Sequence, residues 1–235
     1  MEYLWSLERL PSEGVFPMEQ KDFSEYLSTT EIIDFQHADF QSYSERWDRG
    51  STVLENAVNI YNFVRDDLMY DPFNIRFEVE KVRISNIVKG DRGHCIDKAM
   101  VFIGLCRKEG LPARLGLARV QNHMGTERLE AILQTNVLVP HGYAEVYLED
   151  RWVKCTPAFN KELCDKLGVE PLEFNGTDDS VFQAYDREGG DFMQYLEDYG
   201  GFADLPRELV FDLFQKEYPH LLDDQGQFRS DLLKR

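Results

Sequence analysis

The stretch Gly93-His94-Cys95-Ile96-Asp97-Lys98-Ala99 decides the fold, because it places a cysteine where a loop turns into a helix. Apolar residues follow with helical spacing and predict a helix from Ile96 to Lys108, which Gly110 and Pro112 end. A helix start offers free backbone N–H groups and a partial positive charge, and both favour a thiolate. We therefore expect the pKa of Cys95 to lie below the value of about 8.5 for a free thiol, as a nucleophile requires.

A second stretch supplies a possible general base. Side chains from His141 to Leu148 alternate in character and predict a strand, and Glu149-Asp150 predicts a tight turn. Residues 151–156 predict the paired strand, which ends before a proline. A cysteine at a helix start and His141 at a strand start, far apart in sequence, fit the logic of cysteine nucleophile catalysis.

The flanking segments carry weaker signals. Thr52-Val53-Leu54-Glu55 has the capping-box pattern and predicts a helix to about Leu68, whereas 73–84 should be extended. Residues 113–120 predict a strand, 126–134 a loop or short helix, and Pro206 the start of a helix. Residues 1–48 are aromatic-rich, and we expect this arm to pack against the core or to form edge strands, with a short strand or helix over 27–35.

The composition indicates a packed domain. Of 235 residues, 43% are hydrophobic and 13% aromatic, which is ample for a core. A net charge of −17 disfavours binding to nucleic acid, because phosphate would be repelled. The N-terminus has no signal-peptide pattern and no stretch has the length of a membrane helix, so we expect a cytoplasmic protein that does not bind membranes.

We predict one domain over 1–235, with a core of about 50–165, an N-terminal arm over 1–49 and an acidic C-terminal extension over 166–235. Residues 162–212 hold 14 acidic and 3 basic residues, and we expect this extension to cover the core. The four cysteines should be free thiols in a reducing compartment. We expect Cys106 and Cys155 to be buried core residues and Cys164 to lie at the surface or an edge.

Several of these segments resemble the transglutaminase-like superfamily, a branch of the papain-like cysteine enzymes. The resemblance covers roughly residues 50–160. It rests on the approach to the cysteine (83–95, RISNIVKGDRGHC), its helix and exit turn (98–99 and 105–114, LCRKEGLPAR), the histidine strand (141–146, HGYAEV) and a leading helix (60–66, IYNFVRD, with Tyr70). It implies an α+β fold in which a nucleophile at a helix N-terminus packs against an antiparallel β-sheet that carries the histidine.

The resemblance also implies an activity. Cys95 would attack an amide or ester carbonyl, His141 would serve as the base, and peptidase, amidase, deamidase and transamidase reactions would all share this chemistry without a cofactor. The Cys95 backbone N–H and one unidentified donor would hold the oxyanion. The substrate would be a peptide or protein, and the sequence leaves the oligomeric state open.

One position departs from the family pattern. The segment Trp152-Val153-Lys154-Cys155-Thr156-Pro157-Ala158 aligns with the strand where the family usually has an aspartate, and Thr156 stands at that position. A threonine can orient an imidazole through one hydrogen bond but carries no charge to stabilise an imidazolium. Asn160 could serve instead, as an asparagine does in papain-like sites.

Two other interpretations concern the same residues. The missing aspartate also fits a catalytically silent binding protein that uses the groove for a peptide or protein partner.

No Cys-x-x-Cys and no His-x-x-x-His pattern occurs, so we expect no metal site. His94 could tune access to the thiol or bind an oxyanion, although a loop histidine is the simpler interpretation.

Overall fold

The computed structural model describes residues 22–123, 127–229 and 232, and it has the expected α+β fold. Its helices are α1 (Ser24–Leu27), α2 (Ala38–Ser44), α3 (Val53–Asp67), α4 (Val79–Val82), α5 (Ile84–Ile87), α6 (Cys95–Lys108), α7 (Glu127–Leu133), α8 (Lys161–Leu167), α9 (Arg207–Glu217) and the 3-10 turn η1 (Pro219–Leu221). Its strands are β1 (Met69–Tyr70), β2 (Arg92–Gly93), β3 (Ala113–Asn122), β4 (Val137–Leu148), β5 (Arg151–Cys155) and β6 (Met193–Phe202).

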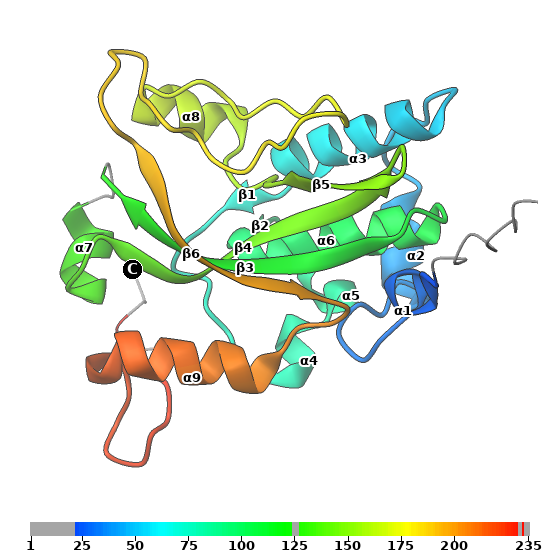
Figure 1. The fold of residues 1–235 in the computed structure, drawn as a ribbon. Coiled ribbons are helices and arrows are strands. Elements are labelled where there is room, and N and C mark those ends of the chain that lie inside the picture. Colours follow the sequence, from blue (N-terminus) through cyan, green and yellow to red (C-terminus); the bar gives the residue numbers. More distant parts are fainter. Residues whose placement is uncertain (1–21, 124–126, 230–231, 233–235) are drawn as a thin grey trace, which may run out of the picture.

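The main sheet is antiparallel, with the strand order β5-β4-β3-β6 (Figure 1). The predicted hairpin is confirmed: Glu149 and Asp150 connect β4 to β5 with φ angles of 45° and 66°. Two central residues with positive φ give a turn whose twist matches that of the flanking strands. In the pairing of β3 with β4, Ala118 lies opposite His141.

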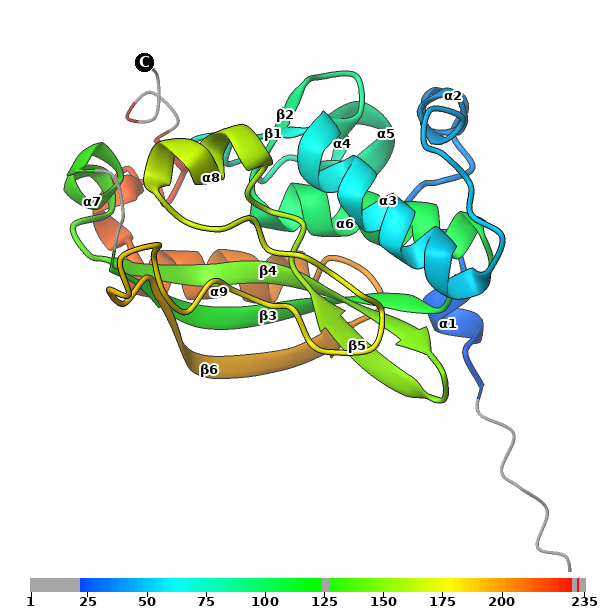
Figure 2. The ribbon, with the colours of Figure 1, turned by 90° about the horizontal axis from the view of Figure 1, so that it is seen from above.

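Helix α6 lies at the centre of the molecule, between the sheet and α3 (Figure 2). Every residue from Cys95 to Arg107 is buried, as expected for a helix that is apolar on most sides. The capping box at the start of α3 is also confirmed, because the Thr52 side chain accepts a hydrogen bond from the Glu55 N–H and the Glu55 carboxylate accepts one from the Thr52 N–H.

Two local expectations are wrong. Residues 73–84 are not extended throughout, since the short helix α4 lies within them and α5 begins at their end. Beyond Leu27, the segment 27–35 forms neither a strand nor a helix. Ile32 and Ile33 lie in this irregular segment and are buried in the core. Of the two expectations for the N-terminal arm, packing is confirmed for residues 22–48, which contain no strand.

The C-terminal extension does more than cover the core. It adds β6 to the sheet beside β3, a strand that the sequence analysis did not predict. Its helix α9 packs with α7 and the start of β4 in a second apolar cluster that includes Leu129, Leu133, Val139, Phe214 and Tyr218. Among the described residues, no helix is both long enough and apolar enough to cross a membrane.

Candidate active site

Cys95 is the first residue of α6, as the sequence predicts. His94 is the N-cap, and its Nδ1 accepts a hydrogen bond from the Asp97 N–H at 3.2 Å, while the Asp97 carboxylate accepts one from the His94 N–H at 3.2 Å. This reciprocal arrangement occupies Nδ1 of His94 and fixes the first turn of the helix. The cysteine is therefore held at a defined helix start.

Buried Lys98 anchors the same turn to α3. Its Nζ donates to the backbone carbonyl oxygens of Leu68 and, at 2.9 Å, of Arg65, both at the C-terminal end of α3. Those carbonyls lie in the last turn of a helix and have no partner within it. Burial lowers the pKa of Lys98 to about 7, and even a neutral amine has two protons for these two acceptors. Lys98 thus positions the first turn of α6, a role that the sequence did not predict.

Gly142 brings the histidine strand against the cysteine. Its N–H donates a hydrogen bond to Sγ of Cys95 with an N–S distance of 3.4 Å. The last paired residue of β5, Cys155, lies opposite Ala144, so β5 ends before it would oppose Gly142. A Cβ at position 142 would lie 2.6 to 3.0 Å from atoms of Ile96, so only glycine allows this approach. In the sequence, the glycine that directly follows His141 is the feature that could have indicated this contact.

The expected low pKa of Cys95 is wrong for this conformation. Burial raises it to about 11, although the N–H groups of Gly142, Ile96 and Cys95 itself act in the opposite direction. The thiol is only 7% exposed, and desolvation of a thiolate outweighs the favourable field of the helix start. At neutral pH the group is a thiol.

His141 is buried as well, and burial lowers its pKa to about 4, with a smaller contribution from repulsion by His94. Neither ring nitrogen has a hydrogen-bond partner among the described residues, and hence neither is bonded to the Cys95 thiol. The described residues therefore contain no preformed thiolate–imidazolium pair between Cys95 and His141. The sequence predicted His141 itself as the partner of Cys95. The structure brings the next residue, Gly142, to Sγ, whereas His141 and Cys95 line different cavities.

Thr156 and His141 line one small cavity of about 10 Å³, and the Thr156 hydroxyl also lacks a partner among the described residues. The hydroxyl is thus free to orient the imidazole. Asn160 is engaged elsewhere, because its Oδ1 accepts a hydrogen bond from the Tyr70 N–H at 3.3 Å and the residue is the N-cap of α8. The geometry favours Thr156 over Asn160 as the neighbour of His141.

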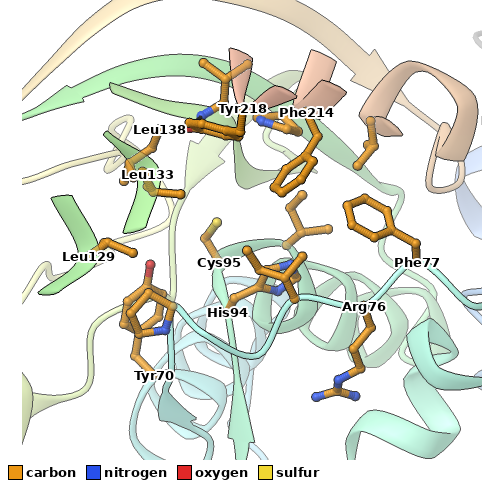
Figure 3. Close-up of a pocket in the computed structure, with 16 residues that line it drawn as sticks. Tyr70, Arg76, Phe77, His94, Cys95, Leu129, Leu133, Leu138, Phe214 and Tyr218 are labelled. Atoms are coloured by element: carbon orange, nitrogen blue, oxygen red, sulfur yellow. Dashed lines mark hydrogen bonds between the residues drawn. The ribbon is translucent and has the colours of Figure 1, made fainter. Parts of the chain in front are cut away.

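Cys95 opens into a different, largely apolar cavity of about 80 Å³ (Figure 3). The walls come from the loop after β1, the start of α6, α7, the start of β4 and α9, and consist of Tyr70, Pro72, Ile75, Arg76, Phe77, His94, Cys95, Ile96, Leu129, Leu133, Leu138, Val139, Pro140, Val210, Phe214 and Tyr218. The contribution of α7 and α9 was not visible in the sequence, because neither helix carries a catalytic motif.

Helix α9 is fixed over this cavity by polar contacts. The Tyr218 hydroxyl accepts from the Val139 N–H at 2.8 Å and donates to the Val137 carbonyl at 2.7 Å. Arg119 and Glu217 form a bidentate ion pair with both N–O distances at 2.7 Å. The acidic extension therefore forms a wall of the candidate site.

Tyr70 presents a hydroxyl to the cavity. Figure 3 shows its hydroxyl end and the Cys95 thiol both pointing into the pocket. The ring packs edge-on against Phe159 with centroids 4.8 Å apart, which fixes its orientation. Burial and then the nearby Cys95 raise the pKa of Tyr70, so the hydroxyl stays protonated and can donate a hydrogen bond.

The remaining thiols lie elsewhere. Cys106 and Cys155 are fully buried, as predicted, and the expectation of a surface position for Cys164 is wrong, since it is buried in α8. All four cysteines are free. No cluster of three or more His, Cys, Asp or Glu side chains suited to a metal ion occurs within 22–123, 127–229 and 232.

Comparison with known proteins identifies a family whose model this chain matches. Residues 41–157 match the model of the Transglutaminase-like superfamily. No curated protein matches the sequence significantly. A solved structure from Cytophaga hutchinsonii, described as a "putative cysteine protease", is similar with 18% sequence identity and a TM-score of 0.37. That match covers 57% of this chain and 40% of the other, so the chain spans less than half the length of that protein.

Proposed function

Residues 41–157 belong to the transglutaminase-like superfamily, and from that premise we propose that the chain is a cysteine-dependent acyl-transfer enzyme acting on amide bonds. Cys95 is the nucleophile, His141 the general base and Thr156 the residue that orients the imidazole. The substrate is a peptide or protein, and the outcome is peptidase, amidase, deamidase or transamidase chemistry according to whether water or an amine resolves the intermediate.

The observation that carries this proposal is the hydrogen bond of 3.4 Å from the Gly142 N–H to Cys95 Sγ. It joins the strand of the proposed base to the thiol of the proposed nucleophile, two segments that lie far apart in sequence. Contacts in ligand-free sites are often long and tighten only when substrate binds, so the unbonded imidazole remains compatible with a role as base.

The neutral state of both groups suggests how the reaction begins. The Cys95 thiol attacks the carbonyl carbon while its proton passes to His141, which therefore acts as a general base and not as half of a preformed ion pair. The imidazolium then protonates the leaving amine as the C–N bond breaks, and a thioester on Cys95 remains. Water or a second amine attacks the thioester and releases the thiol.

Two donors are available for the oxyanion of the tetrahedral intermediate. One is the backbone N–H of Cys95 at the start of α6, where helix N–H groups lack intrahelical acceptors. We assign the second role to the Tyr70 hydroxyl, which faces the same cavity as the thiol. Asn160 positions this tyrosine through its bond to the Tyr70 N–H.

The test uses p-nitrophenyl acetate as an activated acyl donor. We expect a burst of p-nitrophenolate and an acetyl group on Cys95, mapped by mass spectrometry of the digested protein. The burst should disappear in Cys95→Ala and persist in Cys106→Ala, which removes a thiol far from the cavity. An acetyl group on another residue, or an unchanged burst in Cys95→Ala, would overturn the assignment.

A second candidate function is a silent binding protein on the same fold. Two observations favour it: an uncharged Thr156 replaces the usual aspartate, and burial keeps both Cys95 and His141 neutral. A folded protein that shows no acetylation of Cys95, but binds peptides in the groove, would support this alternative.

A further inference from the structure

The cavity beside Cys95 has walls that are mainly apolar. Leu129 and Leu133 of α7, Leu138 and Val139 of β4, and Phe214 of α9 surround the space into which Sγ points (Figure 3). A group attached to that sulfur would replace water with aliphatic and aromatic contacts. Burial of apolar surface is favourable in proportion to area, so such walls discriminate by hydrophobicity.

Arg76, the charged side chain that lines the cavity, does not change the apolar character of its walls. Arg76 lines the pocket, but its guanidinium points away from the space in Figure 3. Its Nε donates to Asn74 at 2.9 Å, its Nη1 donates to the Lys81 carbonyl at 3.0 Å, and Asp97 lies 3.6 Å from its Nη2. The guanidinium is thus already partnered, and a carboxylate in the cavity would be desolvated without a free cation to pair with it among the lining residues of this cavity.

The cavity also limits size. Its volume is about 80 Å³, roughly half of the 150 Å³ that admits benzene in an engineered protein cavity. A branched aliphatic chain fits within such a space, whereas an aromatic ring would either extend out of this half-open pocket or displace its walls. Phe214 and Leu129 are both at least nine-tenths buried, so these walls are packed on their outer sides and resist displacement.

We infer that this cavity is an acyl-group pocket for a small, branched aliphatic side chain of valine or leucine size, adjacent to the carbonyl that Cys95 attacks. The inference rests on the proposed function, since it names the substrate class of the same site. It assigns the specificity to α7 and α9, helices that hold no catalytic residue.

A series of p-nitrophenyl esters tests the inference, with acetyl, butyryl, isovaleryl, benzoyl and succinyl groups as the acyl part. In each reaction the S–C bond forms at Cys95, the ester C–O bond breaks, p-nitrophenolate leaves and the thiol proton passes through His141 to solvent. We expect the rate of Cys95 acylation to rise about fourfold per buried methylene from acetyl to isovaleryl. Benzoyl and succinyl should be at least about tenfold slower than isovaleryl, which corresponds to about 1.4 kcal/mol of barrier.

Two variants assign the selectivity to the walls. Phe214→Ala enlarges the cavity and should move the preference from isovaleryl to benzoyl, whereas Leu129→Phe should slow isovaleryl more than acetyl. Gln215→Ala, an exposed position on α9 next to Phe214, should leave the profile unchanged. Near-ultraviolet circular dichroism identifies variants that have lost native packing, and the wild-type series decides the question without them.

Failures of the two proposals are distinguishable. Acylation of Cys95 that is equally fast for all acyl groups, or fastest for succinyl, would overturn the aliphatic pocket and leave the nucleophile intact. A Cys95 that accepts no acyl group from any ester would overturn the proposed function and the pocket together.

Discussion

Along one face of β4, Tyr143 and Glu145 have charged or polar partners, whereas His141, two residues earlier, has none among the described residues. The Tyr143 hydroxyl donates to both carboxylate oxygens of Asp198 at 2.9 and 3.0 Å. Glu145 pairs with Arg114, and Lys154 bridges Glu145 and Asp198. One end of the strand is therefore fully paired and the other is not.

The difference separates stabilising from functional polar groups. A buried donor or acceptor without a partner costs about 1 to 3 kcal/mol, so a stretch selected only for stability would pair or remove His141. The unpaired atoms at this end are the two imidazole nitrogens of His141 and the Thr156 hydroxyl, which line one cavity. They are the groups to which we assign base catalysis and orientation, and the comparison can be tested on both ends of β4.

The largest effect should come from the unpaired end. Cys95→Ala and His141→Ala should each lower acyl transfer to p-nitrophenyl acetate by at least about a thousandfold, because nucleophile and base act as one unit. The double variant should be no slower than either single variant. Melting temperatures should stay close to that of the wild type. A loss of activity that only accompanies unfolding would contradict this separation of function from stability.

The paired end should respond in the opposite way. Glu145→Ala leaves Arg114 without its main partner and should lower the free energy of unfolding by about 3 kcal/mol, measured by urea denaturation. The folded variant should retain the wild-type burst, since Glu145 does not line the Cys95 cavity. Glu188→Ala, at an exposed position, is the matched control and should be neutral. A burst that falls while stability is unchanged would place Glu145 in the site.

The raised pKa of Cys95 should slow its alkylation. With a pKa of about 11, the thiolate fraction at pH 8 is roughly two hundredfold below that of an ordinary thiol with a pKa of about 8.5, so iodoacetamide should react correspondingly slowly. The rate should rise through pH 10, as followed by mass spectrometry of Cys95, and His141→Ala should leave this profile unchanged. A midpoint below 8.5 that shifts in His141→Ala would reveal the ion pair that this conformation lacks.

His141 should make the protein sensitive to acid. Its pKa is about 4 when folded and about 6.5 when unfolded, so the unfolded chain binds more protons between these values. Stability from the neutral imidazole is complete well above pH 6.5 and falls as the pH approaches 4, with roughly 2 to 3 kcal/mol lost at pH 4.5. Urea titrations of wild type and His141→Gln at pH 7 and 4.5 measure the difference.

The smallest expected effect concerns Thr156. Thr156→Val keeps the shape of the side chain and removes its hydroxyl. It should slow acyl transfer about tenfold, or about 1.4 kcal/mol of barrier, because the hydroxyl could no longer form the hydrogen bond to His141 that the proposed mechanism requires during the reaction. Asn160→Ala should act through Tyr70 and leave the pH dependence of the burst unchanged. A silent Thr156→Val together with a strong pH shift in Asn160→Ala would transfer the orienting role to Asn160.

Much of the fold followed from short-range patterns. The capping box predicted the start of α3, the helical spacing predicted α6, and Glu149-Asp150 predicted the β4–β5 turn. These features depend on residues within a few positions of each other, where local backbone geometry and side-chain spacing decide the outcome. Strand β6 was not predicted, because its pairing with β3 is long-range and its sequence alternates weakly.

The sequence by itself determined that a cysteine stands at a helix start and a histidine on a strand, and its resemblance to the family predicts an aspartate where Thr156 stands. Only the tertiary structure decided the protonation of these groups and the walls around them. Burial raises the pKa of Cys95, whose cavity is walled in part by α9, and burial also lowers the pKa of His141. Desolvation of this kind depends on what surrounds a group in space. A local motif can supply the reacting atoms, but their charge depends on the whole fold.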